Sequence, residues 1–380
     1  MNEDERYRTS TQYRLWSYTP EDLASQRAAT TRTATERVRA AIQRIRASKA
    51  SANGKDGEGV EDGSNDKPVS LPLQTEVNCL TPEEELKLVA FYCKQILDLA
   101  DHLKVPTDVK ATAAQYLKRF YITNSIMTYH PTDILKTALF FATKTENHYY
   151  RLTKFADAIG KTKAEDVLAS EFLLTQGLRF TFDVRHPYRA LEGATMELQA
   201  LANGTTPALP GGSAIPPSEQ PKNMSKRVRE AHGKAREYLK TSALLTDVYF
   251  HYTPSQIMFA SLLIADEELT MWYMSVKLQD TSMREKVTDT LQSCAEMLKS
   301  VPPSSQPSPA EIIVLKGLAK KLQKCRNPEK MDLVAINKAA KREGAEEGLD
   351  EKIVKKRKLE RERVEREGHD LFGPELKRSS

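Results

Sequence analysis

Two charged side chains, Lys144 and Glu171, occupy helical positions where apolar residues would be expected. Lys144 follows the run "ALFFAT", and a rotation of about 100° per residue places Phe140 and Phe141 on either side of it. Glu171 lies on a stripe with the i, i+4, i+7, i+11 spacing of one helix face, together with Val167, Leu174 and Leu178. An ammonium and a carboxylate in apolar surroundings each need a polar partner. These residue types therefore predict ionic recognition, either as an internal ion pair or as a site for another molecule.

The sequence contains none of the motifs that would make this recognition part of a chemical reaction. We find no P-loop, no G-x-G-x-x-G loop, no H-R-D or D-F-G set and no G-x-S-x-G elbow. The seven histidines lack the spacing of metal ligands, and the four cysteines include no C-x-x-C pair. We therefore expect no catalytic residue, no cofactor and no metal site, and the cysteine usage favours a reducing compartment.

Composition narrows the class of protein further. The 380 residues carry 57 basic and 52 acidic side chains, a formal net charge of +5, which is too balanced for a protein that binds nucleic acid chiefly by charge. The 39% hydrophobic content suggests folded cores with polar tails. Because no uncharged apolar stretch reaches the length of a membrane helix, about 18 residues, we expect a soluble protein.

Helices must position the two charged residues, because nearly every segment from about 80 to 300 has helical and not alternating apolar spacing. Lys144 closes an apolar helix that starts near Pro131. The stretch "KAEDVLASEFLLTQGLRFTF" predicts one continuous helix that carries Glu171. Another helix is expected after Thr81, a good N-cap followed by proline and three glutamates.

The helix that carries Lys144 belongs to an internal repeat. The segment "YHPTDILKTALFFAT" begins at Tyr129, and "YTPSQIMFASLLIAD" begins at Tyr252. In each copy a proline starts an apolar helix whose alanines and serines allow close helix packing. The chain is therefore predicted to be all-α, with two related helical domains. Lys144 aligns with Glu267, so the common fold does not require a lysine at this position.

Breaks in the helical pattern set the expected boundaries. A linker rich in Gly, Ser, Asp and Lys and an insertion with five prolines and three glycines are both predicted to be disordered. The C-terminal tail contains "KKRK", which indicates either a solvated segment or a nuclear localisation signal. The expected parts are an N-terminal aromatic and basic segment with a helix (1–46), the linker (47–72), a first domain (73–183), a second domain (184–300) with the insertion (201–223), a C-terminal helix (308–340) and the charged tail (341–380).

Several segments resemble the cyclin family. "YLKRFYITNSIMTYHP" followed by "ALFFATKTE" resembles the first cyclin box, and the repeat resembles the tandem cyclin fold, two boxes of five helices each. Within the family, "HPYRALEG", "TDVYFHYTPSQI" and "VLKGLAKKLQKC" are most similar to the H-type cyclins. The N-terminal "STQYRLWSYTPEDL" resembles the start of an extra helix that packs with a C-terminal helix outside the boxes.

The resemblance implies a regulatory subunit, not an enzyme, that binds and allosterically activates a cyclin-dependent kinase. It implies that the lysine and glutamate bond main-chain groups beside the kinase's C helix, and the expected kinase-binding residues are Lys144, Glu171, Phe140, Phe141 and Glu146. The H-type likeness further implies a nuclear CDK-activating kinase module, with a RING-finger assembly subunit and the TFIIH core as partners. Such a module phosphorylates the C-terminal domain of RNA polymerase II. Direct specific nucleic-acid binding and membrane binding are not implied.

Other interpretations stay open. A C-type cyclin of a Mediator kinase would share the Trp-bearing N-terminus, although "YTPSQI" and "KKLQKC" favour the H type. A TFIIB-like nucleic-acid-binding protein of the same fold would carry an N-terminal zinc ribbon, for which the sequence has no cysteine set. The aromatic and amphipathic pattern of residues 10–46 also suggests that they support kinase activation beyond simple binding.

Overall fold

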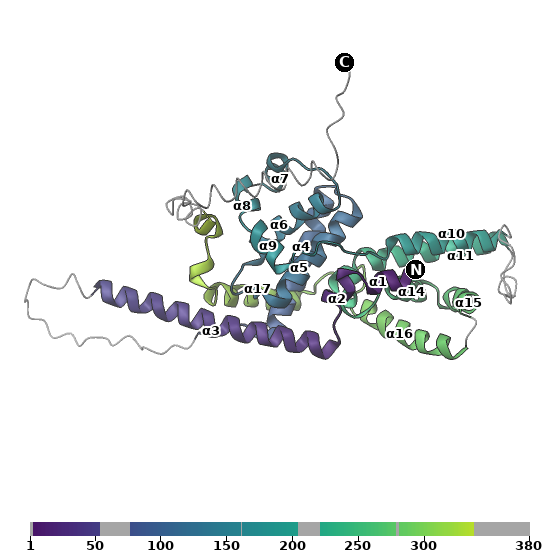
Figure 1. Cartoon of the computed structure of the whole chain (residues 1–380), viewed down its shortest axis with the longest axis horizontal. Coiled ribbons are helices and arrows are strands. Elements are labelled where there is room, and N and C mark those ends of the chain that lie inside the picture. The colour runs from purple at the N-terminus through teal and green to yellow at the C-terminus, as the bar shows by residue number, and fades with distance from the viewer. Residues whose placement is uncertain (1–2, 54–76, 161, 204–220, 279–280, 338–380) are drawn as a thin grey trace, which may run out of the picture. The chain divides into compact units, whose positions relative to one another are not determined.

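The computed structural model describes residues 3–53, 77–160, 162–203, 221–278 and 281–337 (Figure 1). Within these ranges every regular element is a helix, which confirms the all-α prediction. The described residues up to Met331 form one compact unit, and residues 332–337 belong to a second. The charged tail at 341–380, with its "KKRK" run, lies outside the described residues.

The N-terminal part of the chain forms three helices, α1 (Glu3–Arg8), α2 (Thr11–Trp16) and α3 (Pro20–Asn53). The hydroxyl of Ser10 caps α2 by accepting a hydrogen bond from the amide of Tyr13. The predicted linker was wrong for 47–53, which continue α3. The segment "ASKASAN" contains neither proline nor glycine, so the helix continues through it although most of its residues are small or polar. The remainder of the predicted linker, 54–72, lies outside the described residues.

The first helical domain is built around one central helix, α5. Nearly the whole length of α5 is buried, and it contacts α3, α4, α6 and α9. The expected N-cap, Thr81, is present at the start of α4. It forms a capping box with Glu84, in which each side chain bonds the other residue's main-chain amide. The helices of this domain are α4 (Pro82–His102), α5 (Thr107–Thr123), α6 (Pro131–Thr145), α7 (Leu152–Ile159), α8 (Ala164–Leu168) and α9 (Glu171–Gly177).

The second domain repeats the arrangement around α14, which contacts α10, α11, α15 and α16. Its helices are α10 (Tyr188–Ala202), α11 (Pro221–Lys240), α12 (Ser242–Leu245), α13 (Val248–His251), α14 (Pro254–Ala265), α15 (Glu267–Lys277) and α16 (Thr281–Lys299). The boundaries of the predicted insertion were too wide, because 201–202 belong to α10 and 221–223 to α11. Residues 204–220 lie outside the described residues.

The repeat predicted from the sequence corresponds to α6 and α14. Each helix has a proline in its first turn and a side-chain cap before it, from His130 in the first domain and Thr253 in the second. The two copies differ at their ends, because α14 stops at Ala265 whereas α6 continues to Thr145. Glu267, which aligns with Lys144, therefore starts the following helix and does not close the repeat helix.

The C-terminal part of the first compact unit contains α17 (Pro309–Lys324) and the short 3-10 helix η1 (Pro328–Lys330). The prediction of one helix over 308–340 was therefore too long, since a proline at 328 has no amide to continue the α-helical ladder. Leu318 and Leu322 bury α17 against the core, and α17 contacts α4. The N-terminal helix α3 contacts η1, where Arg44 forms an ion pair of 2.9 Å with Glu329.

Most buried apolar side chains belong to one cluster that runs through both domains. A second, smaller cluster contains Trp16, Leu23, Ile122 and Phe250. Its members come from the N-terminal segment, the first domain and the second domain, so three parts of the chain meet there.

Candidate functional site

Lys144 and Glu171 form a bidentate ion pair. The Nζ of Lys144 lies 2.7 Å from Oε1 and 2.9 Å from Oε2 of Glu171. Their side chains are 43% and 27% exposed, respectively, so both reach the surface of the first domain. Lys144 therefore reaches solvent and also has a polar partner, so both needs of a lysine next to apolar residues are met. The lysine stands in the last turn of α6, where the helix leaves the core.

The aromatic ring of Phe140 packs against the ammonium group of Lys144. The Nζ of Lys144 lies 4.9 Å from the centre of the Phe140 ring, within the range of a cation–π interaction. Phe140 itself is buried and packs against Phe155, with ring centres 5.2 Å apart. The apolar side chain thus fixes the position of the charge, while the ammonium stays accessible.

Glu171 is the first residue of α9, and the single continuous helix predicted around it is broken. Leu168 ends α8 and Glu171 begins α9. A continuous helix would pair the carbonyl of Val167 with the amide of Glu171. That carbonyl instead accepts a buried hydrogen bond of 2.6 Å from the hydroxyl of Thr137 in α6. The tertiary bond ties the glutamate's segment to the helix that carries the lysine.

A close contact between Gly177 and Phe120 sets the far end of α9. A Cβ atom added to Gly177 would lie 2.4 Å from Cδ2 of Phe120, closer than real Cβ atoms approach. Since Phe120 is fully buried in α5, this glycine allows α9 to pack directly on the central helix. Glu171 therefore starts a helix that is fixed to both α5 and α6.

The structure does not bring the other two expected residues to this pair. Phe141 is buried on a different side of α6, with ring centres 5.8 Å from Tyr116 and 5.0 Å from Phe182. Glu146 lines a separate cavity of about 570 Å³ between the two domains. There its Oε1 accepts a hydrogen bond of 2.6 Å from the hydroxyl of Thr112.

His186 stands at the same interdomain cavity and is held neutral. Its Nε2 lies 2.8 Å from the hydroxyl oxygen of Thr112, and its Nδ1 lies 2.9 Å from that of Tyr249. Burial, together with the nearby charge of Arg119, lowers the pKa of His186 to about 3. These hydrogen bonds join the two domains, because Thr112 belongs to the first and Tyr249 to the second.

An open cavity of about 500 Å³ lies beside Lys144, and sequence reasoning missed most of its residues. Tyr149, at its edge, is 89% exposed, and Phe172, next to Glu171 in the chain, is 69% exposed. The run "NHYYRL" after α6 was the available signal. Tyr149 in this run is exposed, whereas the ring of Tyr150 packs 5.6 Å from that of Phe155. The cavity is lined by Phe140, Thr143, Lys144, Asn147, His148, Tyr149, Tyr150, Arg151 and Leu152.

A half-exposed ion pair beside an aromatic cavity suits the binding of another protein. Exposed aromatic side chains and fixed polar groups are the features that dominate binding energy at such interfaces. Among the described residues, no cluster of three or more His, Cys, Asp and Glu side chains could hold a metal ion. None of the described helices is both long and apolar enough to span a membrane.

Both domains match families of known proteins. Residues 71–183 match the family described as "Cyclin, N-terminal domain", and residues 186–299 match "Cyclin C-terminal domain". Cyclin CCL1 of Saccharomyces cerevisiae is 34% identical over 277 residues, 73% of this chain and 62% of that relative. The match thus covers less than two thirds of this relative's length. Cyclin-H of Xenopus laevis is 28% identical, over 68% of this chain and 76% of that protein.

Two solved structures share the fold over most of the chain. A chain of the CAK complex from Chaetomium thermophilum bound to ATP-gamma-S is 36% identical, with a TM-score of 0.73, covering 92% of this chain and 98% of that one. A chain of the yeast TFIIK (Kin28/Ccl1/Tfb3) complex is 29% identical, with a TM-score of 0.52, covering 77% of this chain and 100% of that one.

Proposed function

This chain belongs to the cyclin family, and from that premise we propose that it is the H-type regulatory subunit that binds and activates a cyclin-dependent kinase. The observation that carries the proposal is the Lys144–Glu171 pair, exposed beside an aromatic cavity on the first cyclin box. The likeness to a chain of a CAK complex supports the same assignment. The two domains are called the first and second cyclin box from here on.

The ion pair retains hydrogen-bonding capacity for a partner. A lysine ammonium has three donors, of which Glu171 takes two, and a carboxylate accepts more than two hydrogen bonds. The free donor of Lys144 suits a main-chain carbonyl, and Glu171 suits a main-chain amide. Phe140 and the cavity beside it suit an apolar side chain from the kinase's C helix. Phe141 and Glu146 enter the proposal as supports of α6, since neither lies beside the pair.

Activation follows from selective binding and not from chemistry in this chain. Kinase catalysis requires a lysine on the third strand paired with a glutamate on the C helix. A cyclin that binds the helix-in state more tightly shifts the kinase toward that state, by no more than the difference between its two affinities. In this proposal the chain orients the kinase helix and contributes no catalytic group.

The proposed assembly is a nuclear CDK-activating kinase module of TFIIH with a third, RING-finger subunit. The presence of three named components in the yeast TFIIK complex supports a third subunit. The substrate expected for this module is the C-terminal domain of RNA polymerase II.

Reconstitution tests the proposal directly. The full chain is added to purified candidate cyclin-dependent kinases from the same source, and phosphorylation of a polymerase C-terminal repeat peptide is measured. We expect one kinase to bind the chain and to gain activity in proportion to the complex formed. Co-purification with a Mediator kinase, and not with TFIIH subunits, would instead identify a C-type cyclin. Tight and strongly salt-dependent DNA binding by the chain alone would favour the TFIIB-like alternative.

A further inference from the structure

The N-terminal segment, defined here as residues 3–46, bonds to both cyclin boxes. On the first box, the hydroxyl of Thr30 in α3 donates a hydrogen bond of 2.8 Å to the carbonyl of Ile122. On the second box, the amide of Tyr18 donates one of 2.8 Å to the carbonyl of Phe250. The carbonyl oxygen of Tyr18 lies 2.9 Å from Nδ1 of His251. The segment thus spans the junction between the boxes.

Asp247 lies at the centre of this junction. It forms a bidentate pair with Arg27 of α3, with N–O distances of 2.7 Å and 3.0 Å. Its other neighbour is Lys118 of α5, whose Nζ lies 3.7 Å from Oδ1. Lys118 also donates a hydrogen bond to the carbonyl of Thr246. One carboxylate of the second box is therefore shared between a cation of the N-terminal segment and a cation of the first box.

The charges at this junction are mostly withdrawn from water. The side chain of Lys118 is 5% exposed, and those of Arg27 and Asp247 are 17% and 22% exposed. Burial alone would raise the pKa of Asp247, but the hydrogen bonds from Arg27 and the charge of Lys118 lower it to about 2. The carboxylate is therefore charged, and removing Arg27 would leave it with the more distant of its two cations.

The small apolar cluster adds an independent link between the same three parts. Trp16 and Leu23 of the N-terminal segment pack there with Ile122 of the first box and Phe250 of the second, and each is at most 2% exposed. The Nζ of Lys118 lies 5.2 Å from the centre of the Phe250 ring, so the charged and apolar links adjoin. Without the segment, both box residues would lose their apolar cover.

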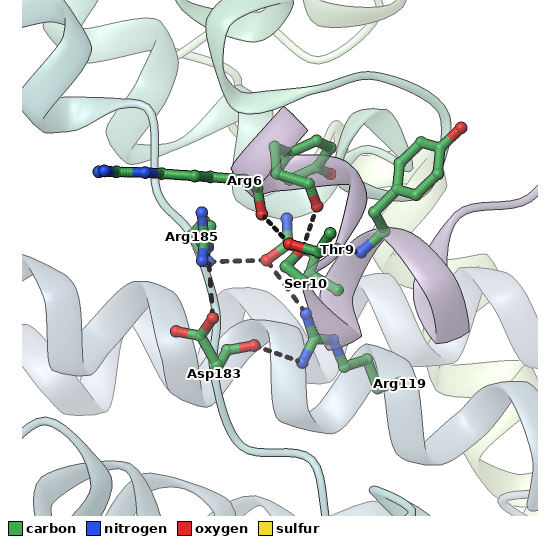
Figure 2. A network of polar contacts seen from close by, with 9 residues as sticks. Arg6, Thr9, Ser10, Arg119, Asp183 and Arg185 are labelled. Carbon is green, nitrogen blue, oxygen red and sulfur yellow. Dashed lines mark hydrogen bonds and ion pairs between the residues drawn. The ribbon is translucent and has the colours of Figure 1, made fainter. Parts of the chain in front are cut away.

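The chain that connects the boxes is held by the same segment (Figure 2). The side-chain carbonyl of Gln12 accepts a hydrogen bond of 2.7 Å from the main-chain amide of Arg185. Arg119 of the first box donates a hydrogen bond of 3.2 Å to the carbonyl of Asp183. Its guanidinium carbon lies 5.1 Å from the centre of the Trp16 ring. Trp16 in turn donates a hydrogen bond of 2.9 Å to the hydroxyl of Thr181.

We propose that Asp247 is a positioning residue through which the N-terminal segment fixes the second box against the first, and that this orientation determines how strongly a bound kinase is activated. The first half concerns the free chain alone, whereas the second half rests on the proposed function. Direct contacts between the boxes exist, and among the described residues Arg27 adds the closer cation to Asp247 while Trp16 and Leu23 complete the apolar cluster.

The second box supplies a matched control for the Arg27–Asp247 pair. Arg227 and Asp266 form a bidentate pair with distances of 2.5 Å and 2.7 Å, and their side chains are 18% and 17% exposed. Both of these residues lie within the second box. The two pairs have similar geometry and burial, and Arg227 also forms an ion pair of 2.9 Å with Glu268 of the same box. The control pair therefore joins residues of one box, whereas the Arg27–Asp247 pair joins separate parts of the chain.

Hydrogen exchange of the free full-length chain tests the positioning role without a kinase. We expect Arg27→Gln and Asp247→Asn each to speed amide exchange at 119–123 and 246–252 by roughly tenfold or more, because breaking a buried ion pair opens the surrounding contact. Exchange in the core of α6 and α14 should stay unchanged. Arg227→Gln should affect exchange only near its own site. Arg27→Gln leaves every residue of both boxes intact, so it remains informative if Asp247→Asn fails to fold.

The activation half is tested with the kinase complex. We expect both junction variants to lower the maximal kinase rate while leaving the half-saturating concentration of the chain unchanged, and Arg227→Gln to change neither. Exchange that rises uniformly, or equally in the junction and control variants, would overturn the positioning role. An altered exchange pattern with an unchanged maximal rate would overturn the link to activation only. A chain that activates no kinase would contradict the proposed function and leave the exchange result standing.

Discussion

Lys277 and Glu197 form an ion pair in the second box that closely resembles the proposed kinase-binding pair of the first. The Nζ of Lys277 lies 2.5 Å from Oε1 of Glu197, and the side chains are 40% and 31% exposed. The same ammonium lies 5.7 Å from the centre of an aromatic ring, that of Tyr273. Here the hydroxyl of Tyr273 donates a hydrogen bond of 2.6 Å to the second oxygen of Glu197. The two pairs share charge, exposure and an adjacent aromatic ring, so the second serves as a control for the first.

Replacement of the proposed kinase-binding pair should weaken kinase association specifically. We expect Lys144→Ala and Glu171→Ala each to reduce the binding free energy by about 2–5 kcal/mol, since the remaining charge is left unpaired at the interface. Both should change the free energy of unfolding by less than about 1 kcal/mol, as exposed ion pairs contribute little. Titration calorimetry with the kinase and urea denaturation of the free chain measure the two quantities. Lys277→Ala should leave kinase affinity unchanged, and equal losses in both boxes would contradict the assignment.

Tyr149 should contribute binding energy without contributing stability. Its ring is 89% exposed, so Tyr149→Ser removes little packing in the free chain. We expect kinase affinity to fall by about 2 kcal/mol if the ring is covered in the complex, as for other aromatic anchors of interfaces. Met196→Ser, at a residue that is 71% exposed on the second box, is the control and should have no effect. Affinity that is unaffected by the tyrosine variant would place the kinase elsewhere.

Gly177→Ala should displace α9 from the central helix. The added methyl group would meet the buried ring of Phe120, and overpacking of this kind costs about 1–3 kcal/mol. Gly193→Ala is the matched helical control, because nothing lies within 4 Å of its added Cβ, and it should stabilise the chain by up to about 1 kcal/mol. Urea denaturation of both variants gives the comparison, and a neutral Gly177→Ala would show that α9 can shift freely.

Stability should fall as pH decreases below the ordinary range of histidine. Burial, with the charge of Arg119, lowers the pKa of His186 to about 3, and burial, with Arg326, lowers that of His130 to about 4. The unfolded chain binds protons at these side chains from about pH 6.5 downward, whereas the folded chain does not. The free energy of unfolding therefore decreases from about pH 6.5 toward pH 4. His186→Gln should flatten this slope, measured by urea denaturation at several pH values, and an NMR signal showing a charged His186 at pH 6 would contradict it.

The features that the sequence predicted well depend on local rules. A proline begins both α6 and α14, and the N-cap Thr81 precedes α4, because these signals involve residues only a few positions apart. The all-α fold and the repeat follow from the same helical spacing. The pairing of Lys144 with Glu171 could also be inferred, since both residues interrupt apolar stripes of one domain.

The features that the sequence did not predict depend on contacts between distant residues. The break before α9 reflects a bond between Thr137 and Val167, which lie 30 positions apart, and no periodicity in the local segment encodes it. Glu146 follows Lys144 by only two positions, so the sequence suggested that both lie at one site. Because α6 ends at Thr145, Glu146 instead lines the interdomain cavity. The exposure of Lys144 likewise depends on where neighbouring helices stop.

The link between Arg27 and Asp247 joins residues that are 220 positions apart. Domains generally fold in the order in which the ribosome synthesises them. Trp16 and Leu23 therefore emerge early and cannot complete their cluster until Phe250 has left the exit tunnel. Until then the apolar side chains of Trp16 and Leu23 lack the cover that Phe250 provides.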